Sequence, residues 1–149
     1  MFVFLVVYNL SAYHYKYLRK KVQAQKEKFM AKILVVDDDK GATGLIEVIL
    51  LSSGYEAIIV NDSSKAMAIA RETKPDLILL DLMMPEPTGF QLCRMMRADP
   101  NFKATPIIII TALDNTDSRV VAIGAGANGF LRKPFHVRDL TEKIKDFLD

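Results

Sequence analysis

The residues of this chain that could do chemistry come directly after short apolar runs. Asp81 closes one run, Asp37 and Asp38 follow a second, Thr111 ends a third, and Lys133 follows a fourth. An apolar run of that length is typical of a buried strand. In open α/β sheets, functional sites form at the carboxyl ends of parallel strands. The sequence therefore predicts that carboxylates, a hydroxyl and an ammonium converge on one small polar site.

These residue types favour phosphoryl transfer with a metal ion. Three carboxylates at one site repel one another, and the single ammonium of Lys133 cannot neutralise them. Mg²⁺ can, because it takes oxygen ligands and typically combines one or two carboxylates with a substrate phosphate. A carboxylate can itself be a nucleophile toward phosphorus and form an aspartyl-phosphate. A metal ion, an ammonium and a hydroxyl then stabilise the charge on the transferring group.

Strand and helix signals alternate regularly after Met30. Gly54 is expected to end the first helix, Ser63 or Ser64 to cap the second, and Asp99 with Pro100 to end the third. Five strand–helix units of this length predict an α/β fold with a doubly wound, five-stranded parallel sheet covered on both faces. Strands are expected near residues 32–37, 55–60, 76–81, 105–111 and 128–132, and helices near 41–53, 64–73, 88–98, 114–124 and 137–148.

Length and composition narrow the class of protein. A chain of 149 residues can form one domain with a sizeable core. The single cysteine, Cys93, excludes an internal disulfide and a cysteine-rich metal site. Residues 1–29 hold six of the 20 Lys and Arg and one of the 18 Asp and Glu, which leaves 14 basic against 17 acidic residues, a net charge of −3, for residues 30–149. This acidic balance argues against a nucleic-acid surface on the folded part.

Over residues 31–148 the chain strongly resembles the receiver domain of two-component response regulators. The resemblance implies a flavodoxin-like fold with strand order 2-1-3-4-5 and a receiver domain over residues 30–149. One departure is visible, because Pro87-Thr88-Gly89 stands where the family often has a Met-Asp-Gly turn, although Thr88 can still cap the next helix. Four segments carry the resemblance: residues 33–39, 80–85, 110–112 and 129–135.

The resemblance implies a role for each acidic residue. Asp81 accepts a phosphoryl group from the phosphohistidine of a histidine kinase or phosphotransfer protein. Asp38 ligates Mg²⁺ directly, and Asp37 helps to hold it through water. Asp81 and the Met83 carbonyl complete the ligands from the protein. The chain would then be a phosphoacceptor in the cytoplasm and not an enzyme, apart from its own phosphotransfer and autodephosphorylation.

The resemblance also implies that the signal leaves the site through a partner-binding surface or by onward relay of the phosphoryl group. Thr111 and Lys133 contact the phosphoryl group, and Phe130 reorients together with Thr111. The expected partner surface is residues 114–148, for a downstream protein or a second copy of the chain, with no nucleic-acid or membrane partner. Because the sequence ends directly after the last expected helix, we expect the stand-alone, single-domain type. The Lys133–Pro134 bond is expected to be cis, as is typical of the family.

Two other functions use similar residues. A phosphatase of the haloacid dehalogenase type also has an aspartyl nucleophile, Mg²⁺, Thr and Lys, but it needs a second carboxylate two residues after the nucleophile. Met83 occupies that position here. A receiver-like interaction module that takes no phosphate usually lacks the acidic pair, the acceptor or the lysine, and all are present. Both alternatives are therefore less favoured than the phosphoacceptor.

Residues 1–29 differ in composition from the rest. An apolar stretch, an aromatic patch and a basic run follow one another, with no Lys, Arg, Asp or Glu in residues 2–15. That stretch is short of the roughly 20 apolar residues of a membrane-spanning helix. We predict that Met30 is the native start and that residues 1–29 are an upstream extension. A short anchoring helix with a basic flank and a self-association segment are the alternatives.

Overall fold

The computed structural model describes residues 12–21, 30–113 and 115–149. The chain divides into two units, Met1–Met30 and Ala31–Asp149. In the first unit, residues 12–21 are helical and all ten are exposed. The second unit contains the sheet and its helices. Among the described residues, the helices fall short of the length and apolar character that crossing a membrane requires.

The second unit is built on one parallel sheet. Its strand order is β2-β1-β3-β4-β5, which confirms the doubly wound, flavodoxin-like fold. The strand bounds lie within two residues of those predicted from sequence. The strands are β1 (Lys32–Val36), β2 (Glu56–Val60), β3 (Leu77–Leu80), β4 (Ile107–Thr111) and β5 (Gly129–Arg132).

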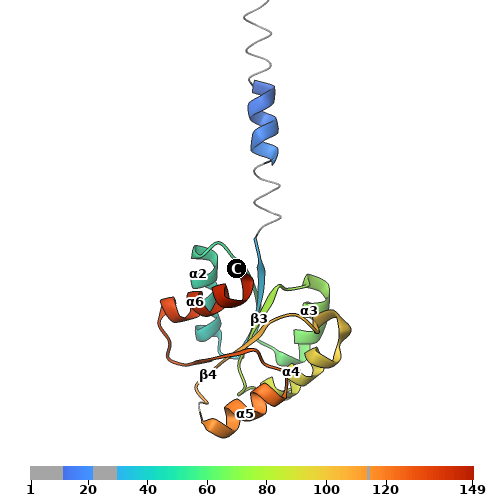
Figure 1. Ribbon diagram of the computed structural model, residues 1–149, viewed down its shortest axis with the longest axis vertical. Coiled ribbons are helices and arrows are strands. Elements are labelled where there is room, and N and C mark those ends of the chain that lie inside the picture. The colour runs from blue at the N-terminus through green and yellow to red at the C-terminus, as the bar shows by residue number, and fades with distance from the viewer. Residues whose placement is uncertain (1–11, 22–29, 114) are drawn as a thin grey trace, which may run out of the picture. The chain divides into compact units, whose positions relative to one another are not determined.

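Helices cover both faces of the sheet (Figure 1). One layer consists of α2 (Lys40–Ser52) and α6 (Val137–Leu148), and the other of α3 (Ala66–Thr73), α4 (Gly89–Ala98) and α5 (Thr116–Gly124). Two 3₁₀ turns, η1 (Ser63–Lys65) and η2 (Pro100–Phe102), complete the connections.

The strand sequences are continuous apolar runs because both of their faces are buried. In β1, Ile33 and Val35 pack with the side chains of α2 and α6, whereas Leu34 and Val36 pack with those of α3, α4 and α5. β3 and β4 are buried over their whole length. Packing on both faces holds the central strands in place and so fixes where the residues that follow them lie.

Helix caps help to fix the loops that follow β1 and β3. The Asp39 carboxylate accepts hydrogen bonds from the backbone N–H groups of Gly41 and Ala42 and so caps α2. Thr88 caps α4 in a reciprocal arrangement with Gln91, as expected. The prediction that Ser63 or Ser64 caps the second helix was wrong.

The cap before the second helix lies further upstream than expected. The Asp62 carboxylate accepts from the Ser64 N–H and begins the turn η1, which leads into α3. Because this extra 3₁₀ turn precedes the α-helix, the cap is displaced to the residue before the turn.

Candidate functional site

The sheet register brings the predicted acidic residues together. β1 and β3 are neighbours, and Val36 is paired with Leu80. Asp37 directly follows β1 and Asp81 directly follows β3, so the two residues lie side by side at the carboxyl end of the sheet. This juxtaposition exists because strand order places β3 next to β1, at the point where an α/β sheet of this topology opens a crevice.

Three carboxylates form a compact cluster at this edge. One ligand oxygen from each of Asp37, Asp38 and Asp81 lies within 4.8 Å of the others. Asp37 is 3% exposed and Asp81 is 8% exposed, whereas Asp38 is open to solvent. Closely spaced carboxylate oxygens with one accessible side are a suitable donor set for a hard divalent cation that keeps several waters.

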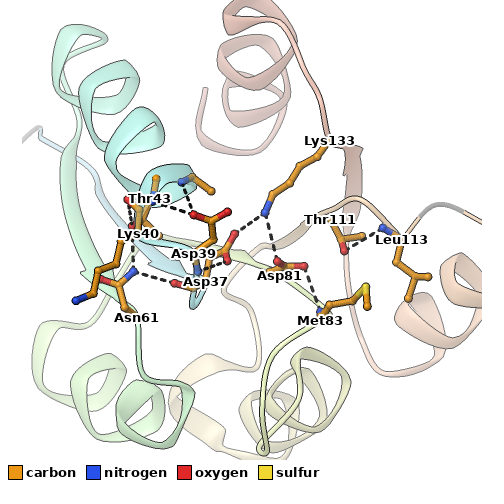
Figure 2. A network of polar contacts seen from close by, with 12 residues as sticks. Asp37, Asp39, Lys40, Thr43, Asn61, Asp81, Met83, Thr111, Leu113 and Lys133 are labelled. Carbon is orange, nitrogen blue, oxygen red and sulfur yellow. Dashed lines mark hydrogen bonds and ion pairs between the residues drawn. The ribbon is translucent and has the colours of Figure 1, made fainter.

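Lys133 reaches the cluster from the loop after β5 (Figure 2). Its Nζ lies 2.5 Å from Asp37 Oδ2 and 3.3 Å from Asp81 Oδ2. The Lys133–Pro134 peptide bond is cis, which confirms the prediction. One ammonium thus faces three carboxylates, and the cluster keeps an excess of negative charge.

The local charges shift the pKa values of the pair that makes the shortest contact. Burial raises the pKa of Asp37, and the nearby Asp81 charge adds to that rise, against the opposing hydrogen bonds from Lys133 and from the Asp39 N–H. For Lys133, burial disfavours the ammonium, but the hydrogen bond to Asp37 and the charges of Asp81 and Asp37 outweigh burial and raise its pKa. The ammonium therefore stays charged at neutral pH, whereas burial makes ionisation of Asp37 less favourable than in water.

Backbone groups orient the Asp81 carboxylate and the Thr111 hydroxyl beside it. The Met83 N–H donates to Asp81 Oδ1 at 3.2 Å. Thr111 is fully buried, and its hydroxyl oxygen accepts from the Leu113 N–H at 3.3 Å. Figure 2 shows Thr111 and Met83 near Asp81, opposite the Asp37 side of the cluster.

Phe130 is placed differently from the polar residues. It lies on β5, is half-buried, and packs against the core on the side of α3, α4 and α5. The guanidinium of Arg119 lies over its ring, 4.8 Å from the centroid. Phe130 therefore borders the site from the core and does not belong to the charged cluster.

Sequence reasoning missed two residues that support the site. The Asn61 side-chain amide donates to the Asp37 carbonyl at 2.9 Å and to Thr43 Oγ1 at 3.0 Å, which ties the end of β1 to α2. Gly89 packs so closely that a Cβ there would lie 2.0 Å from the Asp81 carbonyl oxygen and 2.5 Å from the Leu82 Cα. A glycine in the first turn of a helix, where better helix formers are available, was the signal for such a close approach.

Comparison with known proteins identifies the family. A family model described as the response regulator receiver domain matches residues 33–145. The chain belongs to the response regulator receiver domain family. Its receiver domain is a phosphoacceptor signalling module of two-component systems, and neither the phosphatase nor the unphosphorylated interaction module is favoured.

The curated relatives are longer proteins. MtrA of Mycolicibacterium smegmatis, named a DNA-binding response regulator, is 36% identical over 114 residues, which cover 76% of this chain and 49% of MtrA. The response regulator PleD of Caulobacter vibrioides is 42% identical over 104 residues, 70% of this chain and 23% of PleD. The chain thus spans about half the length of MtrA and less of PleD.

Solved structures share the fold. The chemotaxis protein CheY4 of Vibrio cholerae is similar with a TM-score of 0.76 and 31% identity, covering 79% of this chain and 98% of that one. The receiver domain of the sensor histidine kinase PA1611 from Pseudomonas aeruginosa has a TM-score of 0.75 and 32% identity, covering 80% and 98%. That structure has a magnesium ion coordinated in its active site cleft.

Proposed function

We propose that Asp81 is the residue that accepts the phosphoryl group, from the phosphohistidine of a histidine kinase or phosphotransfer protein. One Asp81 carboxylate oxygen forms the new O–P bond as the N–P bond of the donor breaks, and the released imidazole takes up a proton. The observation that carries this proposal is the position of Asp81 at the carboxyl end of β3, next to the other two carboxylates. Lys133 and the Met83 N–H both contact the Asp81 carboxylate there. Phosphorylation by acetyl phosphate with Mg²⁺ tests it directly.

The acidic cluster is proposed to hold Mg²⁺. Asp38 and Asp81 would be direct ligands, Asp37 would act through water, and the Met83 carbonyl would complete the protein ligands. Bound Mg²⁺ supplies positive charge that neutralises phosphoryl oxygens. The carboxylate spacing and the excess of negative charge support this assignment.

Lys133 and Thr111 are proposed to contact the phosphoryl group. Lys133 already approaches Asp81 with its ammonium, so it can pair with an incoming phosphoryl oxygen without a large rearrangement. Thr111 ends β4, the strand next to β3, and its hydroxyl can turn to donate to such an oxygen. Hydrolysis of the aspartyl-phosphate by water at the same site would release inorganic phosphate and restore the Asp81 carboxylate. This autodephosphorylation is the one hydrolytic reaction that we propose.

The buried carboxylate Asp37 is expected to reduce stability when Mg²⁺ is absent. Asp37→Asn removes a buried charge but keeps an oxygen for the Asp39 N–H, so in EDTA its midpoint of thermal unfolding should exceed that of the wild type by a few degrees. The raised pKa of Asp37 means that its proton is held more tightly in the folded state. Ionisation of Asp37 therefore destabilises the wild type as pH rises through that pKa. The difference in unfolding midpoint between Asp37→Asn and the wild type should grow as pH rises above 3.8, the ordinary pKa of an aspartate.

The same melts with Mg²⁺ provide the metal test. Mg²⁺ should raise the midpoint of the wild type, because it binds the folded state, and should do so far less for Asp37→Asn. Asp38→Ala is the matched control: Asp38 is exposed, so its removal should abolish the Mg²⁺ response with a smaller gain of stability in EDTA. A wild-type response to Mg²⁺ in Asp38→Ala would place the metal elsewhere.

The surface formed by α5, β5 and α6 is proposed to pass the signal to a downstream protein or to a second copy of the chain. It corresponds to residues 114–148, of which residue 114 is outside the described residues. Val120 and Ile123 are 63% and 68% exposed on it, so apolar surface is available for a partner. Asp81 phosphorylation would alter this surface through Thr111 and Phe130.

Hydrogen exchange is expected to report that coupling. On phosphorylation, amide exchange should change across residues 115–135 in the wild type. In Thr111→Ala, phosphorylation should still occur, but the change in exchange should be largely lost. The reason is that the hydroxyl that would move toward the phosphoryl group is gone. Peptides outside this region on α2 serve as the internal control. Exchange that stays the same in wild-type residues 115–135 would contradict the proposed output surface.

We propose that residues 30–149 are the receiver domain and that residues 1–29 are dispensable for it. A chain starting at Met30 should fold with the same unfolding midpoint and take up phosphate at Asp81 like the full chain, because the described residues of the segment, 12–21, are all exposed and ordering exposed residues gains no stability. Melting curves and intact mass compare the two chains. A markedly lower midpoint of the shorter chain would contradict this. So would membrane association that the full chain shows and the shorter chain loses.

A further inference from the structure

A cationic side chain lies against the aromatic residue of the proposed switch. Arg119, on α5, has its guanidinium carbon 4.8 Å from the centroid of the Phe130 ring on β5. This is within the range in which a guanidinium is attracted to the face of an aromatic ring. Phe130 is therefore held between the core on one side and a cation on the other.

The sheet register places Phe130 next to Thr111. Phe130 is paired with Ile109 on β4, and both pack into the core beneath α3, α4 and α5. Thr111 follows Ile109 by two residues, so its side chain extends from the same face of the sheet, diagonally adjacent to Phe130. A shift of Thr111 toward the acceptor changes the space beside the Phe130 ring. A ring that moves into that space changes its position relative to the guanidinium.

We propose that Arg119 is a positioning residue of this switch and that its stacking on Phe130 favours the unphosphorylated arrangement of the ring. The inference rests on the proposed function, in which Phe130 moves together with Thr111. The contact would be lost or weakened in the phosphorylated state, so Arg119 opposes activation. An exposed cation–π contact corresponds to about a two- to fivefold change in an equilibrium constant.

Beryllofluoride with Mg²⁺ is a suitable probe, because it occupies the place of a phosphoryl group without a covalent reaction. Its affinity for the full-length wild type, Arg119→Ala, Phe130→Leu and the double variant can be measured by calorimetric titration. Arg119→Ala should bind the probe about two- to fivefold more tightly than the wild type. In the Phe130→Leu background, the same substitution should have no effect, because the ring that Arg119 contacts is gone.

Three further comparisons make the result specific. Arg119→Lys, which keeps the charge but loses the planar group, should lie between the wild type and Arg119→Ala. Arg138→Ala removes an exposed arginine that pairs with Glu142 and not with a ring, so it should leave the affinity unchanged. The single arginine variants should melt close to the wild type, because Arg119 and Arg138 are both exposed.

The outcomes separate this inference from the function on which it rests. Wild-type binding together with unchanged affinity in Arg119→Ala would overturn the role of Arg119 alone. An equal gain in the Phe130→Leu background would also overturn it, because the effect would then pass through other contacts of Arg119. If the wild type neither binds beryllofluoride nor is phosphorylated at Asp81, the proposed function itself fails, and this inference with it.

Discussion

Asp81→Ala is expected to abolish phosphorylation completely. With acetyl phosphate and Mg²⁺, the wild type should gain one phosphoryl group per chain, seen by intact-mass analysis, and should gain none without a divalent metal. The physical reason is that Asp81 supplies the attacking oxygen, so that no neighbouring side chain can replace it in the same geometry. The other two carboxylates lie beside it, but Asp37 is already engaged by Lys133 and by the Asp39 N–H.

Asp39→Ala is the matched control for this experiment. Asp39 follows the same strand as Asp37 but points its carboxylate at the first turn of α2. Its loss should cost about 1 kcal/mol of stability as a missing helix cap and leave phosphate uptake intact. Uptake that persists unchanged in Asp81→Ala would refute the assignment of the acceptor.

Gly89→Ala is expected to destabilise the domain strongly. The new Cβ would lie 2.0 Å from the Asp81 carbonyl oxygen, 2.5 Å from the Leu82 Cα and 2.8 Å from the Asp81 carbonyl carbon. These are backbone atoms of the loop that carries the proposed acceptor, and they cannot move without shifting α4 or the end of β3. We expect a loss of about 3 kcal/mol, or roughly 10 °C in the unfolding midpoint.

The same substitution at Gly44 provides the opposite expectation. Gly44 lies within α2, and a Cβ there meets no other atom within 4 Å. Alanine is the better helix former, so Gly44→Ala should stabilise the domain by about 0.5–1 kcal/mol. Below its melting temperature, Gly89→Ala should also take up phosphate more slowly than Gly44→Ala, because its acceptor loop is displaced. Equal midpoints for the two variants would contradict the close packing at Gly89.

The elements and the chemistry of the site could be predicted from the sequence because their signals are local. Apolar runs such as that before Asp81 identify buried strands, and polar residues directly after them are placed at strand ends. Once these strands form a parallel sheet, those residues must lie on one edge. The sequence therefore predicts the residues of the cluster, and family resemblance predicts the cis bond before Pro134.

The tertiary structure decided the contacts that join distant parts of the chain. Lys133 and Asp37 are 96 residues apart in sequence and meet only because β5 and β1 end at the same edge of the sheet. The approach of Gly89 to the Asp81 carbonyl depends on how α4 packs, and the stacking of Arg119 on Phe130 depends on α5.

The sequence by itself determined which residues could take part and at which end of the sheet they lie, since hydrophobic patterns and turn residues act over a few positions. Which of those residues touch, which are buried and which have their pKa shifted was decided by strand order, register and helix packing. Asp37 and Asp38 illustrate this: they are adjacent acids of the same type, yet one is buried against Lys133 and the other is exposed. Successive residues at the end of a strand point in different directions, so the surrounding fold decides which of the two is buried.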